Sequence, residues 1–226
     1  MSLLARRSVL GAPAGLPDIY QEVEYLESNG RQYIDTGYAV TWPELKYEMK
    51  YLKTSLNGHV FGVDYYGLNP RYMMGQIYNN SLYIGDGMGG VTITTPECVQ
   101  QTNKIYEGSV TVTGTTVETQ QVDLVLNGGS QNFFQKSANR FFRGCPEGCT
   151  AYLFAIRERE DGTPYYLLHG RIYYLRLYDH TGLKVRDFVP CYRKEDRKPG
   201  MYDLVGRTFY TNRGESEFVL GPEVGV

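Results

Sequence analysis

The sequence lacks the long apolar segments, the charge excess and the dense cysteines that are typical of several large classes of protein. No apolar run approaches the roughly 18 residues needed to span a bilayer, so we expect no membrane partner. The 23 basic and 25 acidic residues are intermixed and give a net charge of -2, so no concentrated positive field is available and we expect no nucleic-acid partner. Four cysteines in 226 residues are too few for a disulfide framework, and we expect free thiols.

Residues that commonly hold metal ions are also scarce. Cys145 and Cys149 are spaced like half of a zinc site, but a tetrahedral site needs a second pair of ligands, and the three histidines are not paired at a ligand spacing. A disulfide between the two thiols across their turn would need an oxidising compartment. Asp86, beside glycines, is one carboxylate where calcium requires roughly six to eight oxygens. We therefore predict no metal and no cofactor.

Aromatic and turn-forming residues are abundant. The chain contains 21 Tyr, 9 Phe and 26 Gly, and it has no long stretch rich in Ala, Glu, Lys and Leu. Aromatic and β-branched residues suit the half-buried, pleated surface of a sheet, so the composition favours an all-β protein. A chain of 226 residues can bury one large core, and we expect a single domain over residues 18–226 that follows a short extended arm over residues 1–17.

Residues 44–53, ELKYEMKYLK, fit either a helix or a strand. A helix would place Leu45, Met49 and Leu52 on one face. A strand would alternate an apolar residue with Glu or Lys at every second position, and this alternation is strict. The pattern therefore predicts a strand that is buried on one side.

Other expected strands are separated by clusters of Gly, Pro, Asn and Asp. Residues 151–157, AYLFAIR, form the most continuous apolar run and predict a central strand covered on both faces. Residues 104–126 predict two or three strands around a turn at Thr113–Thr115. Further turns are expected at Ser28–Gly30, of the hairpin type, and at Asp179–Gly182, Lys198–Gly200, Asn212–Gly214 and Gly221–Pro222. Short strands at intervals of roughly ten residues, without helices, favour an antiparallel sandwich of two sheets.

Few residues suit catalysis. The spacing of Glu22, Glu24 and Glu27 resembles that of the carboxylates in laminarinase-type glycoside hydrolases, but Glu24 stands where that motif has Asp, and no cluster of tryptophans accompanies it. On a strand, Glu22 and Glu24 share one face and Glu27 lies on the other. Motifs of serine hydrolases and metalloproteases are missing from the sequence. We predict that the protein is not an enzyme.

Sugar binding has more support. Exposed aromatic rings pack against sugar rings, while amide and carboxylate groups bind the hydroxyls. Residues of these types gather in and near the expected loops, and we take them as candidate glycan-binding residues: Trp42, Tyr65, Tyr66, Asn69, Tyr72, Tyr78 and Asn79. The alternative is that most of the tyrosines fill the faces of the sandwich.

Residues 1–17 differ in composition from the rest of the chain. They are small and apolar, and Arg6 and Arg7 are their only charges. Gly11 and Pro13 interrupt the apolar run that a secretory signal requires, so we predict no signal peptide. A terminal segment of this composition cannot bury enough surface to be ordered alone. We expect it to dock on a partner through Leu3, Leu4, Arg6, Arg7, Val9 and Leu10.

Segments throughout the chain resemble a known family. They are EVEYLESNGRQYIDTGY (22–38), AYLFAIRE (151–158), GRIYYLRLYD (170–179), VRDFVPCYR (185–193), GMYDLVGRTFYTN (200–212) and SEFVLGP (216–222). They are similar to concanavalin A-like (laminin-G-like) jelly-roll domains found in bacteriophage virion proteins and in surface proteins of gut-type bacteria. Leu26 stands where Ile is common, and Cys191 where an aliphatic residue is usual. The resemblance implies a jelly-roll sandwich whose first and last strands share one sheet, with residues 170–222 as scaffold.

The arm and the domain together predict a non-enzymatic bacteriophage virion protein, a capsid or tail accessory, decoration or fibre-like subunit assembled in the host cytoplasm. The arm would attach to other virion proteins in a homo-oligomer or multi-copy assembly. The lectin-like domain would face outward and bind host or mucosal glycans. One alternative is a glycan-binding module of a bacterial cell surface. A third hypothesis is a laminarinase-type glycoside hydrolase that uses Glu22 and Glu27.

Overall fold

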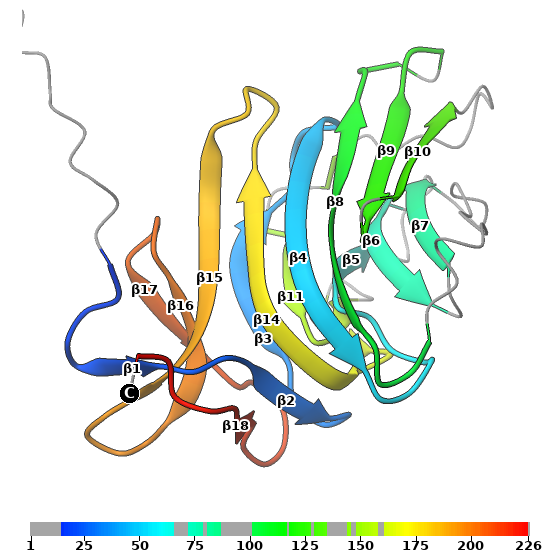
Figure 1. Cartoon of the computed structure of the whole chain (residues 1–226). Helices are drawn as coiled ribbons and strands as arrows, with labels where there is room; N and C mark the ends of the chain where they lie inside the picture. Colours follow the sequence, from blue (N-terminus) through cyan, green and yellow to red (C-terminus); the bar gives the residue numbers. More distant parts are fainter. Residues whose placement is uncertain are drawn as a thin grey trace, which may run out of the picture.

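The computed structural model consists of strands arranged in two layers (Figure 1). It describes residues 15–65, 72–78, 81–86, 101–116, 118–127, 129–134, 144–145, 148–157 and 161–225. These residues form no helix, and therefore none that is long and apolar enough to cross a bilayer. The prediction of an all-β protein is confirmed.

The larger layer is an 11-stranded sheet, which faces the viewer in Figure 1. Its main path runs, in spatial order, through β10 (Gly129–Phe134), β9 (Gln121–Leu126), β8 (Ile105–Thr113), β4 (Leu45–Lys53), β14 (His169–Tyr178), β15 (Lys184–Arg193), β16 (Pro199–Asp203) and β17 (Thr208–Thr211). Neighbouring strands along this path are antiparallel. This pairing agrees with the expected sandwich.

The second layer is a 7-stranded sheet behind the first (Figure 1). It contains, in spatial order, β13 (Pro164–Tyr165), β12 (Ile156–Arg157), β5 (Phe61–Tyr65), β11 (Thr150–Leu153) and β3 (Ile34–Ala39), while β6 (Tyr72–Tyr78) extends from β5 and β7 (Ser81–Asp86) from β6. Only the contact between β12 and β5 is parallel among the described pairs. The two sheets together confirm the predicted two-sheet sandwich.

The core lies between the two sheets, and β4 illustrates how the sequence builds it. Tyr47, Met49 and Tyr51 are buried, while the charged residues between them are partly exposed. The ring of Tyr47 lies 5.6 Å from the ring of Phe61 on β5, so the two layers meet directly. The alternation that predicted a strand over residues 44–53 is thus the alternation between core and solvent.

The large sheet divides where β14 and β15 separate. β15 pairs with β14 over Leu175–Tyr178; beyond that stretch β1 (Tyr20–Glu22) pairs with β15, and β2 (Leu26–Asn29) pairs with β14. β18 (Val219–Leu220) adds to β2, and Val23 forms a bridge to Glu223. These strands lie together at the bottom of the sheet in Figure 1. The expectation that the two ends of the domain share one sheet is confirmed.

The predicted hairpin at Ser28–Gly30 is wrong. β2 belongs to the large sheet, whereas β3, which follows the turn, pairs with β11 in the second sheet. The turn itself forms: Gly30 has a φ of 89°, and its N–H donates to Ser28 Oγ at 3.1 Å. The side-chain oxygen of Gln32 then accepts a hydrogen bond from Asn29 N–H at 3.0 Å and stabilises this turn. The turn therefore passes the chain from one layer to the other.

The predicted turn at Lys198–Gly200 is also wrong in position. Pro199 begins β16, opposite Tyr192, because a proline is tolerated at the first residue of a strand. The chain reverses earlier, at residues 194–196. Asp196 closes that turn: it pairs with Arg193 at 2.6 Å and accepts from Lys198 N–H at 3.1 Å.

Residues 151–156 of the apolar run are buried as expected, but the run is not one strand. β11 lies between β5 and β3, and the chain bends at Phe154, which has a φ of 62°, before β12 begins. Phe154 is fully buried and its ring lies 4.6 Å from that of Phe218. The core holds this residue in a backbone conformation that apolar side chains rarely adopt.

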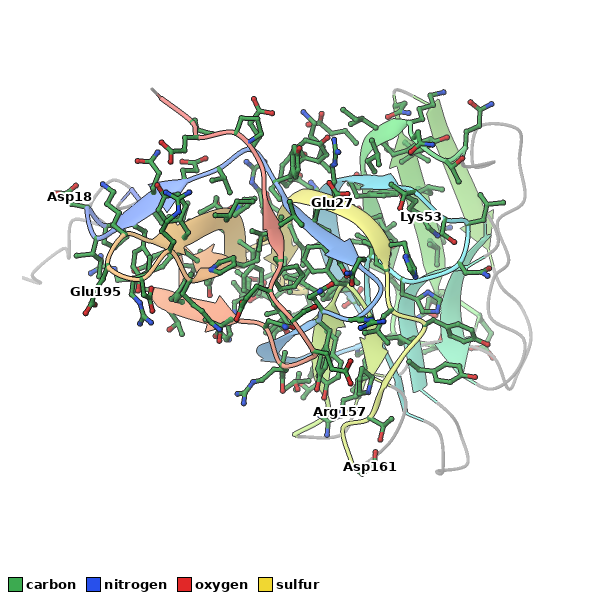
Figure 2. The ribbon with its side chains drawn as sticks, turned by 90° about the horizontal axis from the view of Figure 1, so that it is seen from below. Asp18, Glu27, Lys53, Arg157, Asp161 and Glu195 are labelled. Carbon is green, nitrogen blue, oxygen red and sulfur yellow. The ribbon has the colours of Figure 1, made fainter. Side chains whose placement is uncertain are left out.

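β4 ends in a buried lysine (Figure 2). Lys53 is only 2% exposed, and its Nζ donates to the carbonyl oxygens of Leu56 and Gly58, both at 2.9 Å. Burial lowers the pKa of Lys53 to about 8. The ammonium group therefore holds the loop after β4 although its charge is poorly solvated.

The free energy of unfolding is expected to rise with pH as Lys53 loses its proton. The folded chain releases this proton near pH 8 and the unfolded chain near the ordinary value of 10.5, so between these values the unfolded state binds more protons and stability increases. Lys53 alone contributes a gain of about 2 kcal/mol between about pH 7 and about pH 9.5, and the raised pKa of the Cys191 thiol, about 12, offsets part of this gain above about pH 9. Higher pH reverses the trend, because burial raises the pKa of Tyr152 to about 12 and the unfolded chain loses its tyrosine protons first.

Urea denaturation at a series of pH values measures this effect. Replacing Lys53 by methionine should flatten the rise, whereas Lys50→Met, on the outer face of the same strand, should keep it. Profiles of the wild type and of Lys53→Met that stay parallel from about pH 7 to about pH 9.5 would contradict the role assigned to Lys53.

Candidate functional site

A groove of about 440 Å³ lies on the outer face of the large sheet, near the point where β14 and β15 separate. We call it the β14 groove. Its lining comes from both ends of the chain and from three central strands: Glu22, Val23, Glu24, Lys50, Ile105, Tyr173, Tyr174 and Val224. The groove therefore forms only when the first and last segments have joined the sheet.

β14 turns two neighbouring tyrosines toward this groove because it contains a β-bulge. Ile172 and Tyr174 are opposite successive residues of β4, so Tyr173 is an extra residue in the pairing. Ile172 and Leu175 are both buried in the core, while Tyr173 and Tyr174 both line the groove. Bulges re-aim side chains in this way and are frequent beside functional sites. A regular strand would have pointed one of the two rings into the core.

The carboxylates of Glu22 and Glu24 reach the groove from the segment between β1 and β2. Val23, between them, is buried, and its N–H donates to Pro190 O at 3.0 Å. The N–H of Glu24 donates to Pro222 O at 2.8 Å, so the C-terminal segment fixes the other side. In the part of the chain that the structure describes, neither carboxylate forms an ion pair. Both can accept hydrogen bonds from a ligand.

The groove tyrosines are held by their neighbours. The Tyr174 hydroxyl donates to Glu107 Oε1 at 2.9 Å; burial, and then this hydrogen bond, raises the pKa of Tyr174 to about 12, so the hydroxyl stays protonated near neutral pH. Tyr25 meets the ring of Tyr173 edge-on at 5.4 Å. Lys50 Nζ lies 5.3 Å from the centre of that ring and 3.8 Å from Glu107 Oε2. The rings are therefore positioned before any ligand arrives.

This arrangement suits a ligand with both an apolar face and many hydroxyls. The two rings, with Ile105 and Val224, offer apolar surface, and Glu22 and Glu24 offer hydrogen-bond acceptors beside it. Within the described residues, no group of three His, Cys, Asp or Glu side chains could hold a metal ion. These groups can hold a ligand through packing and hydrogen bonds.

Trp42, a candidate from the sequence, lies elsewhere, in the loop between β3 and β4. It is 49% exposed, and its ring stacks on His180 with centres 4.7 Å apart and planes 29° apart. His180 belongs to the turn between β14 and β15, in which Asp179 accepts from the N–H groups of Thr181 and Leu183. Trp42 is thus an exposed aromatic at the rim of the sandwich, and it does not line the β14 groove.

The other candidates divide between one hairpin and undescribed segments. Tyr65 ends β5 opposite Tyr72 at the start of β6, and Tyr78 ends β6. This hairpin belongs to the second sheet, so the structure does not bring it to the β14 groove. The remaining candidates lie outside the described residues: Tyr66, Asn69, Asn79 and the arm residues Leu3, Leu4, Arg6, Arg7, Val9 and Leu10.

The three glutamates of the laminarinase-like spacing do not share one site. Glu22 and Glu24 line the same groove, as their alternation predicted, while Glu27 does not line it. Glu27 Oε2 accepts instead from Arg171 Nε at 2.7 Å. The pair of carboxylates that the hydrolase hypothesis requires, Glu22 and Glu27, is therefore not gathered in the groove.

The described cysteines are buried thiols, as expected. They are Cys145, Cys149 and Cys191, whereas Cys98 lies outside the described residues. Burial raises the pKa of Cys191 to about 12, so its thiol is a poor nucleophile. Asp86 ends β7, and residues 87–90, which follow it, lie outside the described residues.

A second groove, of about 380 Å³, lies between β3 and β17. It is lined by Asp35, Gly37, Thr208, Phe209, Tyr210, Thr211, Asn212 and Arg213. Asn212 Oδ1 already accepts from Tyr33 N–H at 3.0 Å and from Gly214 N–H at 2.8 Å, and Asp35 Oδ1 accepts from Gly37 N–H at 3.0 Å. These side chains hold their own loops, so the β14 groove offers a ligand more uncommitted polar groups.

No model of a protein family matches the chain, and no curated protein matches it in sequence. Solved structures do match its fold. A candidate carbohydrate-binding protein from Bacteroides ovatus has a TM-score of 0.51 and 15% identity over 89% of this chain, and the chain spans 60% of that protein. The heptameric SAP-like pentraxin from Limulus polyphemus has a TM-score of 0.51 and 10% identity, with 91% of this chain and 94% of the pentraxin covered.

Domains LG4-5 of the mouse laminin alpha1 chain match with a TM-score of 0.49 and 15% identity, over 91% of this chain and 47% of that one. At sequence identities this low, a structural match shows a shared fold and nothing more. The Bacteroides and Limulus structures place the chain among jelly-roll sandwiches of the concanavalin A-like type, which confirms the fold that the resemblance implied.

Proposed function

We propose that the protein is a non-catalytic carbohydrate-binding module that holds a glycan in the β14 groove. The observation on which this rests is the pair of adjacent tyrosines, Tyr173 and Tyr174, that the bulge turns outward beside Glu22 and Glu24. The similarity to a candidate carbohydrate-binding protein from Bacteroides ovatus supports it. Because sandwich folds serve many functions, the site carries more weight than the fold.

The proposed binding uses both sides of the groove. The apolar face of a sugar ring packs on Tyr173, while its hydroxyls donate to Glu22 and Glu24. Lys50 supplies a donor at the floor. A groove this open buries only part of a glycan, so we expect dissociation constants of about 10 μM to about 1 mM.

Replacing Tyr173 by alanine is expected to weaken glycan binding by about 10- to 30-fold. The substitution removes the stacking surface, and packed aromatic anchors commonly supply about 2 kcal/mol in a binding site. A glycan array identifies a bound oligosaccharide, and isothermal titration calorimetry then compares the variants. Tyr178→Ala serves as the matched control, since Tyr178 lies on the same strand but outside the groove.

Trp42→Ala separates the two possible locations of the site. If Trp42→Ala abolishes binding and Tyr173→Ala leaves it unchanged, the glycan binds at the rim and the β14 groove is not the site. Circular dichroism of each variant confirms that the sheet is intact.

Two settings suit such a module. A bacterial cell surface is favoured by the family resemblance, which includes surface proteins of gut-type bacteria. A bacteriophage virion, with residues 1–17 as the anchor, is favoured by the abrupt change of composition at Asp18 and by the family resemblance; it stays a prediction from the sequence. In both settings the domain over residues 18–226 binds the glycan.

A further inference from the structure

The β14 groove carries more negative than positive charge. Glu22 and Glu24 both line it, and in the described part of the chain neither forms an ion pair. The single cation of the lining is Lys50, and its Nζ already lies 3.8 Å from Glu107 Oε2. An incoming anion would therefore meet two unpaired carboxylates and a lysine that already interacts with a third carboxylate, that of Glu107.

The backbone that carries the two carboxylates is also fixed in place, so both side chains stay at the edge of the groove. The N–H of Glu24 donates a hydrogen bond to Pro222 O, and Glu22 O accepts one from Val224 N–H at 3.0 Å. Val23 anchors the segment between them in the core. Like charges held near each other repel by an amount that grows as water is displaced from between them.

Ionised carboxylates accept hydrogen bonds and cannot donate them. A neutral sugar presents hydroxyl donors to Glu22 and Glu24, whereas a sialic acid, uronic acid or sulfate group presents further acceptors with a negative charge. The groove therefore distinguishes ligands by charge as well as by shape.

We infer that the β14 groove selects uncharged glycans and discriminates against anionic ones, with Glu22 and Glu24 as the residues that determine this specificity. The inference rests on the proposed function, since it assumes that a glycan occupies the groove. The expected discrimination is at least about tenfold in dissociation constant between neutral and anionic forms of one oligosaccharide.

An array of neutral oligosaccharides, each paired with the same oligosaccharide capped by sialic acid, tests the inference. The wild-type protein should bind the neutral member of each bound pair at least about tenfold more tightly. Raising the salt concentration should narrow this gap, which is the ratio of the two dissociation constants. The double variant Glu22→Gln/Glu24→Gln should reduce the gap to below about threefold, because the amides keep an acceptor and lose the charge.

A charge-matched control is available elsewhere on the surface. Glu118 and Glu215 are exposed and do not line the groove. The double variant Glu118→Gln/Glu215→Gln changes the net charge by the same amount and should leave the gap at its wild-type value. Lys50→Gln should widen it.

The outcomes separate the inference from the proposed function. If sialylated members bind as tightly as neutral ones while Tyr173→Ala still removes binding, the inference is overturned and the proposed function stands. If both double variants narrow the gap equally, the discrimination comes from net charge, which also overturns the inference. If no oligosaccharide of either kind binds, or Tyr173→Ala has no effect, the proposed function is wrong and the inference falls with it.

Discussion

Replacing Gly170 by alanine is expected to destabilise the folded domain by more than about 4 kcal/mol. Gly170 lies in β14 at the point where this strand pairs with β2 on one side and β4 on the other. A Cβ atom there would lie 2.1 Å from Leu52 O and 3.0 Å from Lys53 Cα, and Gly170 has a φ of 155°. Backbone atoms of a central strand cannot move aside cheaply, so the pairing of β14 with β4 would have to open.

Differential scanning calorimetry measures the effect as a fall in melting temperature of more than about 10 °C. Gly182→Ala is the matched control, because Gly182 also has a positive φ, of 81°, but no atom within 4 Å of the added Cβ. It should cost only about 1 kcal/mol. Equal losses for the two variants would show that the close approach at Gly170 contributes nothing.

Replacing Asp203 by alanine is expected to cost about 3 kcal/mol, because it leaves the partly buried guanidinium of Arg186 and two backbone donors without their acceptor. Asp203 is fully buried; its Oδ1 accepts from Asp187 N–H at 2.9 Å and from Val205 N–H at 3.1 Å. Its Oδ2 lies 3.3 Å from Arg186 Nε. The Arg186 guanidinium in turn packs over the ring of Tyr38 on β3, so the pair links the two sheets.

Chemical denaturation of Asp203→Ala, beside Asp196→Ala, tests this expectation. Asp196 also pairs with an arginine, Arg193, but both side chains are exposed, and exposed pairs contribute little. Asp196→Ala should therefore shift the denaturation midpoint far less. A small effect of Asp203→Ala, similar to that of Asp196→Ala, would mean that the link between the sheets is not needed.

Much of the fold could be predicted from periodicity, because alternation along a strand directly reports which face is buried. Residues 44–53 gave β4 in this way, and residues 104–126 gave β8 and β9 around a turn that includes Gly114. The pairing of the two chain ends followed from the family resemblance. These features depend on local sequence, or on several matching segments at once.

Pairing partners could not be predicted from turn residues. Ser28–Gly30 forms a tight turn, yet the next strand joins the other sheet, because β2 is already paired with β14 and β18. The reversal near Asp196 was displaced for a similar reason. A proline–glycine pair indicates a turn locally, but the sheet needed Pro199 and Gly200 as strand residues opposite Tyr192 and Cys191.

One signal of the candidate site was present in the sequence. In residues 170–178 the buried residues Ile172, Leu175 and Leu177 are spaced by three and then by two. A strict period of two breaks only where a residue is inserted, so this spacing indicates a bulge at Tyr173–Tyr174. The sequence also predicted that Glu22 and Glu24 share a face. Their approach to β14 could not be predicted, because it depends on the point at which β14 and β15 separate.

A crystal structure of the protein with its tightest-binding oligosaccharide would test most directly whether a glycan occupies the β14 groove. We predict a sugar ring packed on Tyr173, with hydroxyls within hydrogen-bonding distance of the carboxylates of Glu22 and Glu24. A glycan bound against Trp42, or on the hairpin of β5 and β6, with an empty β14 groove would contradict the account.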